Sequence, residues 1–169
     1  MPEQAGVSAG TAMRGAFRAY ATGVAIATAV VEGRRVGVLV SSLVSVSVSP
    51  PVVSVSLSDA SFAAQEVLVA DRIAVHMLTG ADRGLADWFA RPRPVADEPE
   101  WVDTVAGEAR LATHGPVLSG SVADRVRAGS ATVMFVTVDR VDEPLDDDPL
   151  ALVHVDRHWH LVARQVTEE

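Results

Sequence analysis

Residues 37–61 read GVLVSSLVSVSVSPPVVSVSLSDAS, and their pattern decides the expected fold. Valine and serine alternate over residues 44–49, and apolar residues alternate with serine again over residues 53–58. A period of two is typical of a β-strand with one face on a core and the other toward water or a ligand. Two adjacent prolines, Pro50-Pro51, cannot lie in a central ladder, so they mark a corner or an edge between two extended segments.

The serines of this stretch form a hydroxyl-rich surface without charged groups, here called the serine ledge. Its members are Ser41, Ser42, Ser45, Ser47, Ser49, Ser54, Ser56 and Ser58. Hydroxyl groups both donate and accept hydrogen bonds, so the ledge could hold a polar, anionic ligand through neutral donors. The same pattern also fits a strand face that is only solvated. The residues alone leave both interpretations open.

The composition restricts the function further. A chain of 169 residues is long enough for one domain with one substantial core, and 49% hydrophobic with 21% charged residues excludes a disordered chain. The net charge of −8 disfavours nucleic-acid binding. All 14 basic residues are arginine, which excludes a Schiff-base lysine or a P-loop. The absence of cysteine excludes disulfides and thiolate chemistry.

The sequence shows no run long and apolar enough to cross a membrane, and its N-terminus lacks the pattern of a signal peptide. We therefore expect a soluble, cytoplasmic protein with no membrane partner.

The N-terminal part of the chain predicts one helix. Residues 1–10 are small and polar and are expected to be a flexible N-terminus. A helix is expected over Thr11–Ala21, with Thr11 as its N-cap and Gly23 as its end.

β-branched or alternating runs predict strands along most of the remaining chain. Glu32-Gly33 predicts the turn of a first hairpin, and Asp156-Arg157 predicts the turn of a last one. The expected strands are Val24–Val31, Arg34–Ser41, Val52–Leu57, Arg72–Leu78, Glu108–Ala112, Ser119–Arg127, Ser130–Val141, Leu150–Val155 and His158–Val162.

Two further helices are expected between the strands. Ser61 is placed to open a helix over Phe62–Ala70, and a second helix is expected over Asp82–Ala90. Residues 91–107 are rich in proline and acidic residues and predict a surface loop. Strands that follow one another favour an antiparallel barrel with a few helices over a parallel sheet. We expect a single domain over residues 11–169.

No motif in the residues alone specifies the chemistry. His154, His158 and His160 lie close in sequence, but no ligand spacing completes a metal site, and a polar strand face explains them better. His76 is expected to be a buried, hydrogen-bonded histidine. The Asp146–Asp148 run is most simply a solvated turn. A serine-hydrolase elbow, a Rossmann fingerprint and a P-loop are all absent from the sequence.

The order of these segments resembles the flavin reductase-like, FMN-binding split-barrel family. Phe17–Ala29 (FRAYATGVAIATA) is similar to the opening strand of that family, and Gly37–Leu57 is similar to its segment with the SVS--PP motif. The similarity continues through Arg72–Ala90 and Gly115–Ala123 to the last hairpin. The resemblance implies an antiparallel Greek-key split β-barrel with a few short peripheral helices.

The resemblance also implies cofactors, partners and site residues. Family members are typically homodimers that bind FMN or FAD near the interface, and many reduce it with NADH or NADPH. For this chain, the resemblance implies the supply of reduced flavin to a partner monooxygenase. Carried over to this chain, Ala27 and Thr28 would border the flavin ring, and Phe89 the ring or the adenine end. Hydroxyl donors for the phosphate and ribityl chain would be Ser41, Ser42, Ser45 and Ser47 of the ledge and Ser61 at its helix start.

This chain departs from the family pattern at several positions. A frequent Asp-His pair is Ser130-Ala131 here, and a frequent Arg-Arg pair is Asp87-Trp88. In the ledge, Leu39, Ser41 and Val44 stand where Thr, Asn and Thr are usual. The leading hypothesis is an NAD(P)H:flavin oxidoreductase. The alternatives are a non-catalytic flavin- or cofactor-binding protein and an oxidoreductase that uses another cofactor, such as a deazaflavin.

Overall fold

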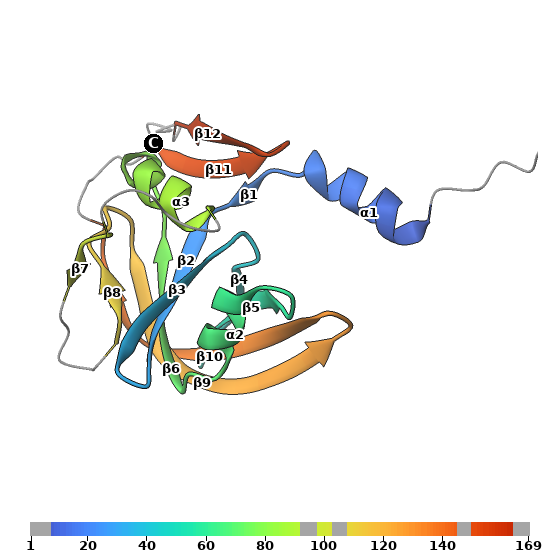
Figure 1. The fold of residues 1–169 in the computed structure, drawn as a ribbon. Helices are drawn as coiled ribbons and strands as arrows, with labels where there is room; N and C mark the ends of the chain where they lie inside the picture. The colour runs from blue at the N-terminus through green and yellow to red at the C-terminus, as the bar shows by residue number, and fades with distance from the viewer. Residues whose placement is uncertain (1–7, 92–97, 103–107, 145–149, 164–169) are drawn as a thin grey trace, which may run out of the picture.

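A seven-stranded antiparallel sheet organises the fold (Figure 1). The computed structural model describes residues 8–91, 98–102, 108–144 and 150–163. The spatial order of the main sheet is β3-β2-β6-β9-β10-β5-β4, and smaller sheets join β1-β11-β12 and β7-β8. The strands are β1 (Thr22–Gly23), β2 (Ala25–Val31), β3 (Arg34–Val40), β4 (Val44–Val48), β5 (Pro51–Ser58), β6 (Arg72–Met77), β7 (Trp101–Val102), β8 (Arg110–Leu111), β9 (Val117–Ala128), β10 (Ala131–Asp142), β11 (Ala151–Val155) and β12 (His158–Val162).

The helices are short and peripheral: α1 (Ala9–Arg18), α2 (Phe62–Leu68) and α3 (Arg83–Phe89), with a 3₁₀ turn η1 (Gly80–Asp82) before α3. The predicted mainly β, antiparallel fold is confirmed. Within the described residues, no helix is long and apolar enough to cross a membrane.

Small and β-branched side chains form most of the core. In β2 the run from Ala25 to Ala29 is fully buried, because β3 and β6 pair with its two edges and side chains cover both faces. Val55 and Leu57 of β5 and Val67 of α2 join the same cluster. The predicted hairpin around Glu32-Gly33 is confirmed as β2–β3.

Most of the serine ledge lies on the β4–β5 hairpin. The two strands of this hairpin differ in burial. Val53, Val55 and Leu57 of β5 are buried, as their alternation predicts. The valines of β4 are exposed instead, up to 86% for Val48, so the prediction that they face the core is wrong. The reason is position: β4 is the edge strand beyond β5, and its only strand neighbour is β5.

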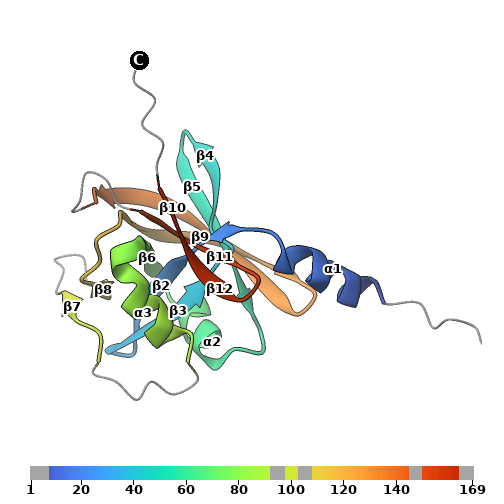
Figure 2. The ribbon, with the colours of Figure 1, turned by 90° about the horizontal axis from the view of Figure 1, so that it is seen from above.

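Helix α1 starts and ends earlier than predicted. Its N-cap is Ser8, whose hydroxyl accepts a hydrogen bond from the backbone N–H of Thr11, and the helix ends at Arg18. Thr11 is therefore not the cap, and Gly23 lies in β1 rather than at the helix end. The helix lies apart from the barrel in both views (Figures 1 and 2) and contains no buried residue.

The remaining predicted elements agree with the structure except at their ends. Ser61 caps α2 as predicted, but that helix ends at Leu68 rather than Ala70. Residues Trp101–Val102, within the predicted surface loop, form a two-stranded ladder with Arg110–Leu111, which is all that is observed of the strand predicted over Glu108–Ala112. The last hairpin turns at Asp156-Arg157 as predicted. The Asp146–Asp148 run lies outside the described residues.

Candidate functional site

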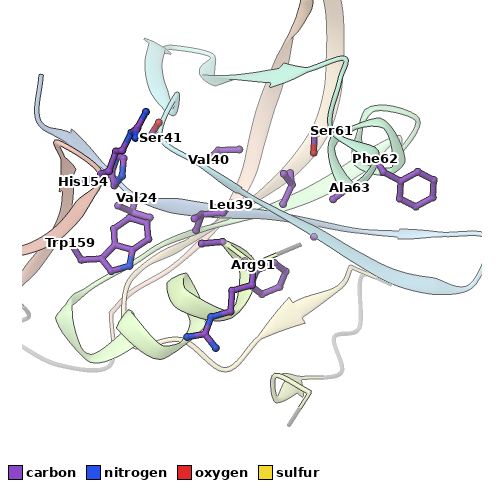
Figure 3. A pocket seen from close by; sticks show the side chains of 15 residues that line it. Val24, Leu39, Val40, Ser41, Ser61, Phe62, Ala63, Arg91, His154 and Trp159 are labelled. Carbon is purple, nitrogen blue, oxygen red and sulfur yellow. The ribbon is translucent and has the colours of Figure 1, made fainter. Parts of the chain in front are cut away.

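A pocket of about 830 Å³ lies beside β3, between the start of α2, the end of α3 and the β11–β12 hairpin (Figure 3). Its size suits a cofactor-sized ligand. Side chains from opposite ends of the sequence line it: Val24, Gly37, Val38, Leu39, Val40, Ser41, Ser61, Phe62, Ala63, Phe89, Ala90, Arg91, His154, Arg157 and Trp159.

Aromatic rings form one wall of the pocket. The rings of His154 and Trp159 lie 4.9 Å apart between centroids at 55°, so the two side chains of the last hairpin contact each other. Trp159 Nε1 donates a 2.9 Å hydrogen bond to Asp87 Oδ1, which joins the hairpin to α3. Flat surfaces of this kind suit stacking with a planar ligand.

Phe89 reaches the pocket because the facing strand carries a glycine. A Cβ atom at Gly37 would lie 2.8 Å from Cε1 of Phe89 and 3.1 Å from Cγ2 of Thr28. The missing side chain therefore leaves the space in which the Phe89 ring lies. Phe89 also contacts Trp88 edge to face, at 4.7 Å between ring centroids.

Three of the eight predicted cofactor residues line this pocket: Ser41, Ser61 and Phe89. The Ser61 hydroxyl accepts a 3.3 Å hydrogen bond from the backbone N–H of Ala64, which leaves its O–H free to donate to a ligand. The chemistry of this lining fits a flavin, because it combines hydroxyl donors and aromatic surface with the positive charge of Arg91 and Arg157.

The other ledge residues lie outside the pocket lining. The Ser42 hydroxyl is used within the fold, since it donates to Ser56 O at 2.9 Å and accepts from Ser56 N at 3.0 Å. Ser45 and Ser47 lie on the edge strand β4, where Ser45 is exposed and Ser47 is half-buried.

Ala27 and Thr28 are fully buried in β2 and do not line the pocket either. The Thr28 hydroxyl is surrounded by protein partners: Ala74 O at 3.3 Å, His76 Nε2 at 3.1 Å and Ala109 O. The residue thus belongs to the interior behind β3, where it is paired with the lining residue Gly37 but is not itself part of the lining. The role of these eight residues in flavin binding stays a prediction.

The other twelve lining residues were not predicted as site residues, and they include Arg91, His154, Arg157 and Trp159. Two of them are arginines, and within the lining there is no aspartate or glutamate. The sequence predicted the hairpin that contains residues 154–159. It gave no signal that this hairpin packs beside β3.

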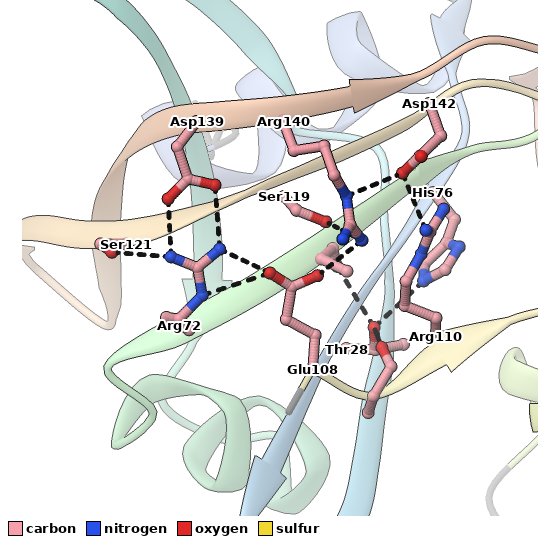
Figure 4. A network of polar contacts seen from close by, with 12 residues as sticks. Thr28, Arg72, His76, Glu108, Arg110, Ser119, Ser121, Asp139, Arg140 and Asp142 are labelled. Atoms are coloured by element: carbon pink, nitrogen blue, oxygen red, sulfur yellow. Dashed lines mark hydrogen bonds and ion pairs between the residues drawn. The ribbon is translucent and has the colours of Figure 1, made fainter. Parts of the chain in front are cut away.

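Behind the pocket, the structure contains an ionic cluster that the sequence did not predict (Figure 4). The fully buried Glu108 carboxylate bridges Arg72 and Arg140, at 2.5 Å and 3.2 Å. Arg72 also pairs with Asp139, and hydrogen bonds from Asp139 and Glu108 raise the pKa of the Arg72 guanidinium. These ion pairs join β6, β10 and the segment before β8, and hydrogen bonds from Arg72 to Ser121 and from Arg140 to Ser119 add β9.

His76 lies beside this cluster and is fully buried, as predicted. Its ring nitrogens lie 3.1 Å from Thr28 Oγ1 and 3.4 Å from Thr113 Oγ1. Burial, assisted by the positive charge of Arg110, lowers the pKa of His76 to about 3. The imidazole is therefore neutral at physiological pH and has a structural role.

Asp82 forms a second buried polar centre, at the start of α3. Burial raises its pKa, but hydrogen bonds from Thr79 and His114 outweigh that effect and hold the pKa below its usual value. The carboxylate accepts from Thr79 N and Oγ1, both at 2.9 Å, and from His114 N at 2.8 Å. It fixes the loop before β9 to the start of α3, away from the pocket lining.

Comparison with known proteins identifies the family. Residues 17–162 match the flavin reductase like domain. FMN reductase (NADH) RutF 2 of Methylorubrum extorquens (strain PA1) is 30% identical over 168 residues, covering 94% of this chain and 92% of that protein. The chain belongs to the flavin reductase-like family.

Solved structures share the whole architecture. The flavin reductase domain protein from Arthrobacter sp. FB24 is 25% identical with a TM-score of 0.83, over 94% of this chain and 98% of that chain. The styrene monooxygenase flavin reductase from Pseudomonas putida S12 is 23% identical with a TM-score of 0.78, over 91% and 99% of the two chains. These similarities confirm the split-barrel fold that the resemblance implied.

Proposed function

We propose that this protein is an NADH:FMN oxidoreductase that supplies reduced flavin to a partner monooxygenase. The observation that carries the proposal is a cofactor-sized pocket that combines the Ser41 and Ser61 hydroxyls with a wall of aromatic rings. The relative from Methylorubrum extorquens is named as an FMN reductase that uses NADH. The reductase from Pseudomonas putida S12 is named for styrene monooxygenase, which supports the proposed partner class.

The protein contributes binding and orientation in this proposal. Ser41 and Ser61 would donate to polar oxygens of the flavin, and Phe89 and Trp159 would lie against its ring. The pocket walls would restrict bulk water around the flavin ring. They would also hold the flavin and the nicotinamide in contact. When bound, the flavin supplies the redox chemistry by accepting a hydride from the nicotinamide.

A titration followed by stopped-flow mixing tests the function. The purified protein is titrated with FMN and FAD, and the flavin-loaded protein is then mixed with NADH or NADPH while the flavin absorbance is followed. We expect micromolar or tighter FMN binding and rapid bleaching by NADH. Failure of both flavins to bind at micromolar concentration contradicts the proposal. The FAD arm and the NADPH arm measure selectivity in the same experiment.

A second candidate is a flavin carrier without dinucleotide turnover, favoured by Ser130-Ala131 in place of the family's Asp-His pair. In the structure Ser130 lies in the turn of the β9–β10 hairpin and Ala131 begins β10, and Asp59 N donates a 3.0 Å hydrogen bond to Ser130 O. It does not line the pocket of its own chain. Flavin binding without bleaching would select the carrier.

A homodimer is the assembly we propose, and the exposed apolar surface supports it. Met13 and Phe17 on α1 and Tyr20 just after it are each at least 58% exposed, and the valines of the edge strand β4 are also exposed. An isolated ten-residue helix is marginal in water, so α1 needs a surface to pack against. Analytical ultracentrifugation should give twice the 17.8 kDa chain mass, and Phe17→Glu should shift the population to the monomer.

A further inference from the structure

The pocket proposed for the flavin is positively charged, although the chain as a whole is acidic. The chain carries a net charge of −8, with 22 acidic and 14 basic residues. Among the described residues that line the pocket there are two arginines and one histidine, and no aspartate or glutamate. Charge close to a cofactor changes its electronic properties as well as its affinity. The lining should therefore affect the oxidation state of a bound flavin.

Reduction adds negative charge to the flavin ring. In the proposed reaction, the C4–H bond of the nicotinamide breaks, the electron pair moves with the hydrogen, and an N5–H bond forms on the flavin. The products are NAD⁺ and a reduced flavin with one more negative charge than the oxidised form, located around N1 and the C2 carbonyl oxygen. A cation near the ring stabilises the reduced form more than the oxidised form, because only the reduced ring carries this charge.

Arg157 lies on the hairpin that supplies the aromatic wall. The strands β11 and β12 are joined by the two-residue turn Asp156-Arg157, and His154 pairs with Trp159 just beyond it. Arg157 and Trp159 both line the pocket. Two residues of extended chain span at most about 7 Å, which is less than the screening length of about 8 Å at physiological salt. A flavin ring against Trp159 is therefore within range of the Arg157 charge.

Arg157 has a backbone conformation that glycine usually adopts. It is the second residue of its turn and has φ +65°, after Asp156 at +48°. The β2–β3 turn has the same pattern, with Glu32 at φ +50°, but its second residue is Gly33, at +76°. Left-handed backbone is unfavourable for arginine and costs nothing for glycine. A strained residue beside a pocket indicates a role in function.

The turn is held in place by bonds on both of its sides. The backbone N–H of Asp156 donates to Arg18 O at 2.7 Å, and His158 Nδ1 lies 2.7 Å from Asp156 O. The strained conformation is therefore supported by the surrounding structure, and the Arg157 side chain is carried on a defined backbone.

The charge of Arg157 is available to a ligand. Its side chain is exposed and forms no ion pair within the described part of the chain, whereas five other described arginines do: Arg34, Arg72, Arg110, Arg127 and Arg140. Asp87, which accepts the hydrogen bond of Trp159, and Asp156, which adjoins Arg157, do not line the pocket. The guanidinium group can therefore act on a group inside the pocket.

We propose that Arg157 makes the pocket favour the reduced, anionic flavin over the oxidised flavin. The inference rests on the proposed reductase function and adds to it a residue that sets the reduction potential of bound FMN. With this charge in place, reduction by NADH is more favourable, and the pocket holds the reduced flavin more tightly than the oxidised one. Arg91 lies on a different side of the pocket from the hairpin (Figure 3), so its charge should contribute less.

The reduction potential of bound FMN tests this inference without NADH. The FMN-loaded protein is reduced slowly by xanthine and xanthine oxidase beside a reference dye, and the two absorbances give the midpoint potential. Arg157→Gly is expected to lower the preference for reduced FMN about tenfold, which corresponds to about 30 mV for a two-electron couple. The affinity for oxidised FMN should stay within about threefold of the parent.

Sulfite gives a second measurement of the same effect. It adds to N5 of oxidised flavin and leaves a negative charge on the ring, so its affinity depends on the stabilisation of that charge. Spectral titration of the FMN-loaded protein should show about tenfold weaker sulfite binding in Arg157→Gly than in the parent.

Three further variants separate the charge of Arg157 from other effects. Arg157→Lys keeps the charge and should retain the potential of the parent. Arg91→Gln removes a cation from another side of the lining, and Arg83→Gln removes an exposed cation of α3 outside the lining. Both should change the preference for reduced FMN by less than about twofold. Arg157→Gly should melt at or above the temperature of the parent, because glycine suits the left-handed turn.

The failure of this inference and the failure of the proposed function give different results. Equal potentials for the parent and Arg157→Gly, or equal shifts in Arg157→Gly and either Arg157→Lys or Arg83→Gln, overturn the inference even where NADH bleaches the flavin. A potential that depends on the Arg157 charge, without any bleaching by NADH, supports the inference and removes the reductase function. Absence of FMN binding overturns both.

Discussion

Trp159 Nε1 donates a 2.9 Å hydrogen bond to Asp87 Oδ1, so strand β12 is attached to the helix that carries Phe89. The two elements otherwise approach the pocket from different directions (Figure 3). This bond fixes the relative positions of two aromatic walls. It also assigns a structural task to Asp87, which replaces a basic residue of the family pattern.

Removal of the Asp87 acceptor should loosen the Trp159 wall. Asp87→Leu is expected to weaken FMN binding about fivefold, in line with the loss of one hydrogen bond of about 1 kcal/mol. Asp87→Asn retains a carbonyl acceptor and should bind FMN almost as the parent does. Flavin fluorescence quenching measures both affinities, and equal affinities for the Leu and Asn variants would contradict this role.

A side chain at position 37 should displace Phe89 from the pocket. In Gly37→Ala, the new Cβ would lie 2.8 Å from Phe89 Cε1, so the ring must shift. We expect a several-fold loss of FMN affinity with a small change in melting temperature, because alanine is favoured over glycine in a strand by about 0.5–1 kcal/mol. In the double variant with Phe89→Leu, the alanine should have little further effect on FMN affinity. Additive losses would show that positions 37 and 89 act independently.

Substitutions of Ser61 should separate helix capping from ligand binding. Ser61→Ala removes the N-cap of α2 and should lower the free energy of unfolding by about 1 kcal/mol. Ser61→Asp keeps a good cap and should retain the parent stability, but it adds a negative charge to the pocket. FMN affinity should fall at least tenfold in the Asp variant, because the carboxylate repels the phosphate. Urea denaturation and flavin titration give the two readouts.

His76 should make the protein sensitive to acid. Its pKa is about 3 in the folded state and 6.5 ordinarily, so between these values the unfolded chain binds a proton that the native state does not. The free energy of unfolding should therefore be constant above pH 6.5 with respect to His76. It should fall by up to about 1.4 kcal/mol per pH unit as the pH decreases toward 3.

The comparison for this acid effect is His76→Asn, studied by urea denaturation from pH 8 to pH 4. The variant should be less stable at pH 8, since its contacts to Thr28 and Thr113 change, but its stability should fall less steeply with acid. His158→Gln, on the exposed last hairpin, should leave the slope unchanged. Parallel slopes for the parent and His76→Asn would rule out this origin of the acid sensitivity.

The buried Glu108 carboxylate should be essential for stability. Glu108→Gln leaves Arg72 and Arg140 without the negative charge between them and is expected to cost about 3–5 kcal/mol. The matched control is Glu66→Gln, which breaks the 2.8 Å pair with the exposed Arg34 and should cost less than about 1 kcal/mol. Equal denaturation midpoints for the two variants would contradict the claim that the buried carboxylate stabilises the fold more than the exposed pair does.

Local signals in the sequence predicted most elements of the fold. The Ser61 cap, the Glu32-Gly33 turn and the alternation of β5 are set by neighbours in the chain, and each was found as expected. The same alternation misled in β4, because Val44, Val46 and Val48 lie on an edge strand rather than over the core. A period of two identifies a strand but does not say whether anything covers it.

The candidate site was predictable only where local pattern and family resemblance coincided. Ser41, Ser61 and Phe89 line the pocket, whereas Thr28 proved to be an interior residue with three protein partners. Arg157 and Trp159 were missed because only tertiary packing brings their hairpin to the pocket beside β3. Glu108 was missed for the same reason, since its two arginine partners come from β6 and β10.

The hydrogen bond from Asp156 N to Arg18 O connects the outlying helix α1 directly to the turn that carries Arg157. Any protein that packs on α1 therefore acts on the same short segment as a ligand in the pocket. Such linkage is reciprocal: if association through α1 strengthens ligand binding by some factor, the ligand strengthens association by the same factor. Assembly and ligand affinity would then be coupled equilibria. The fraction of occupied pockets would therefore depend on the protein concentration.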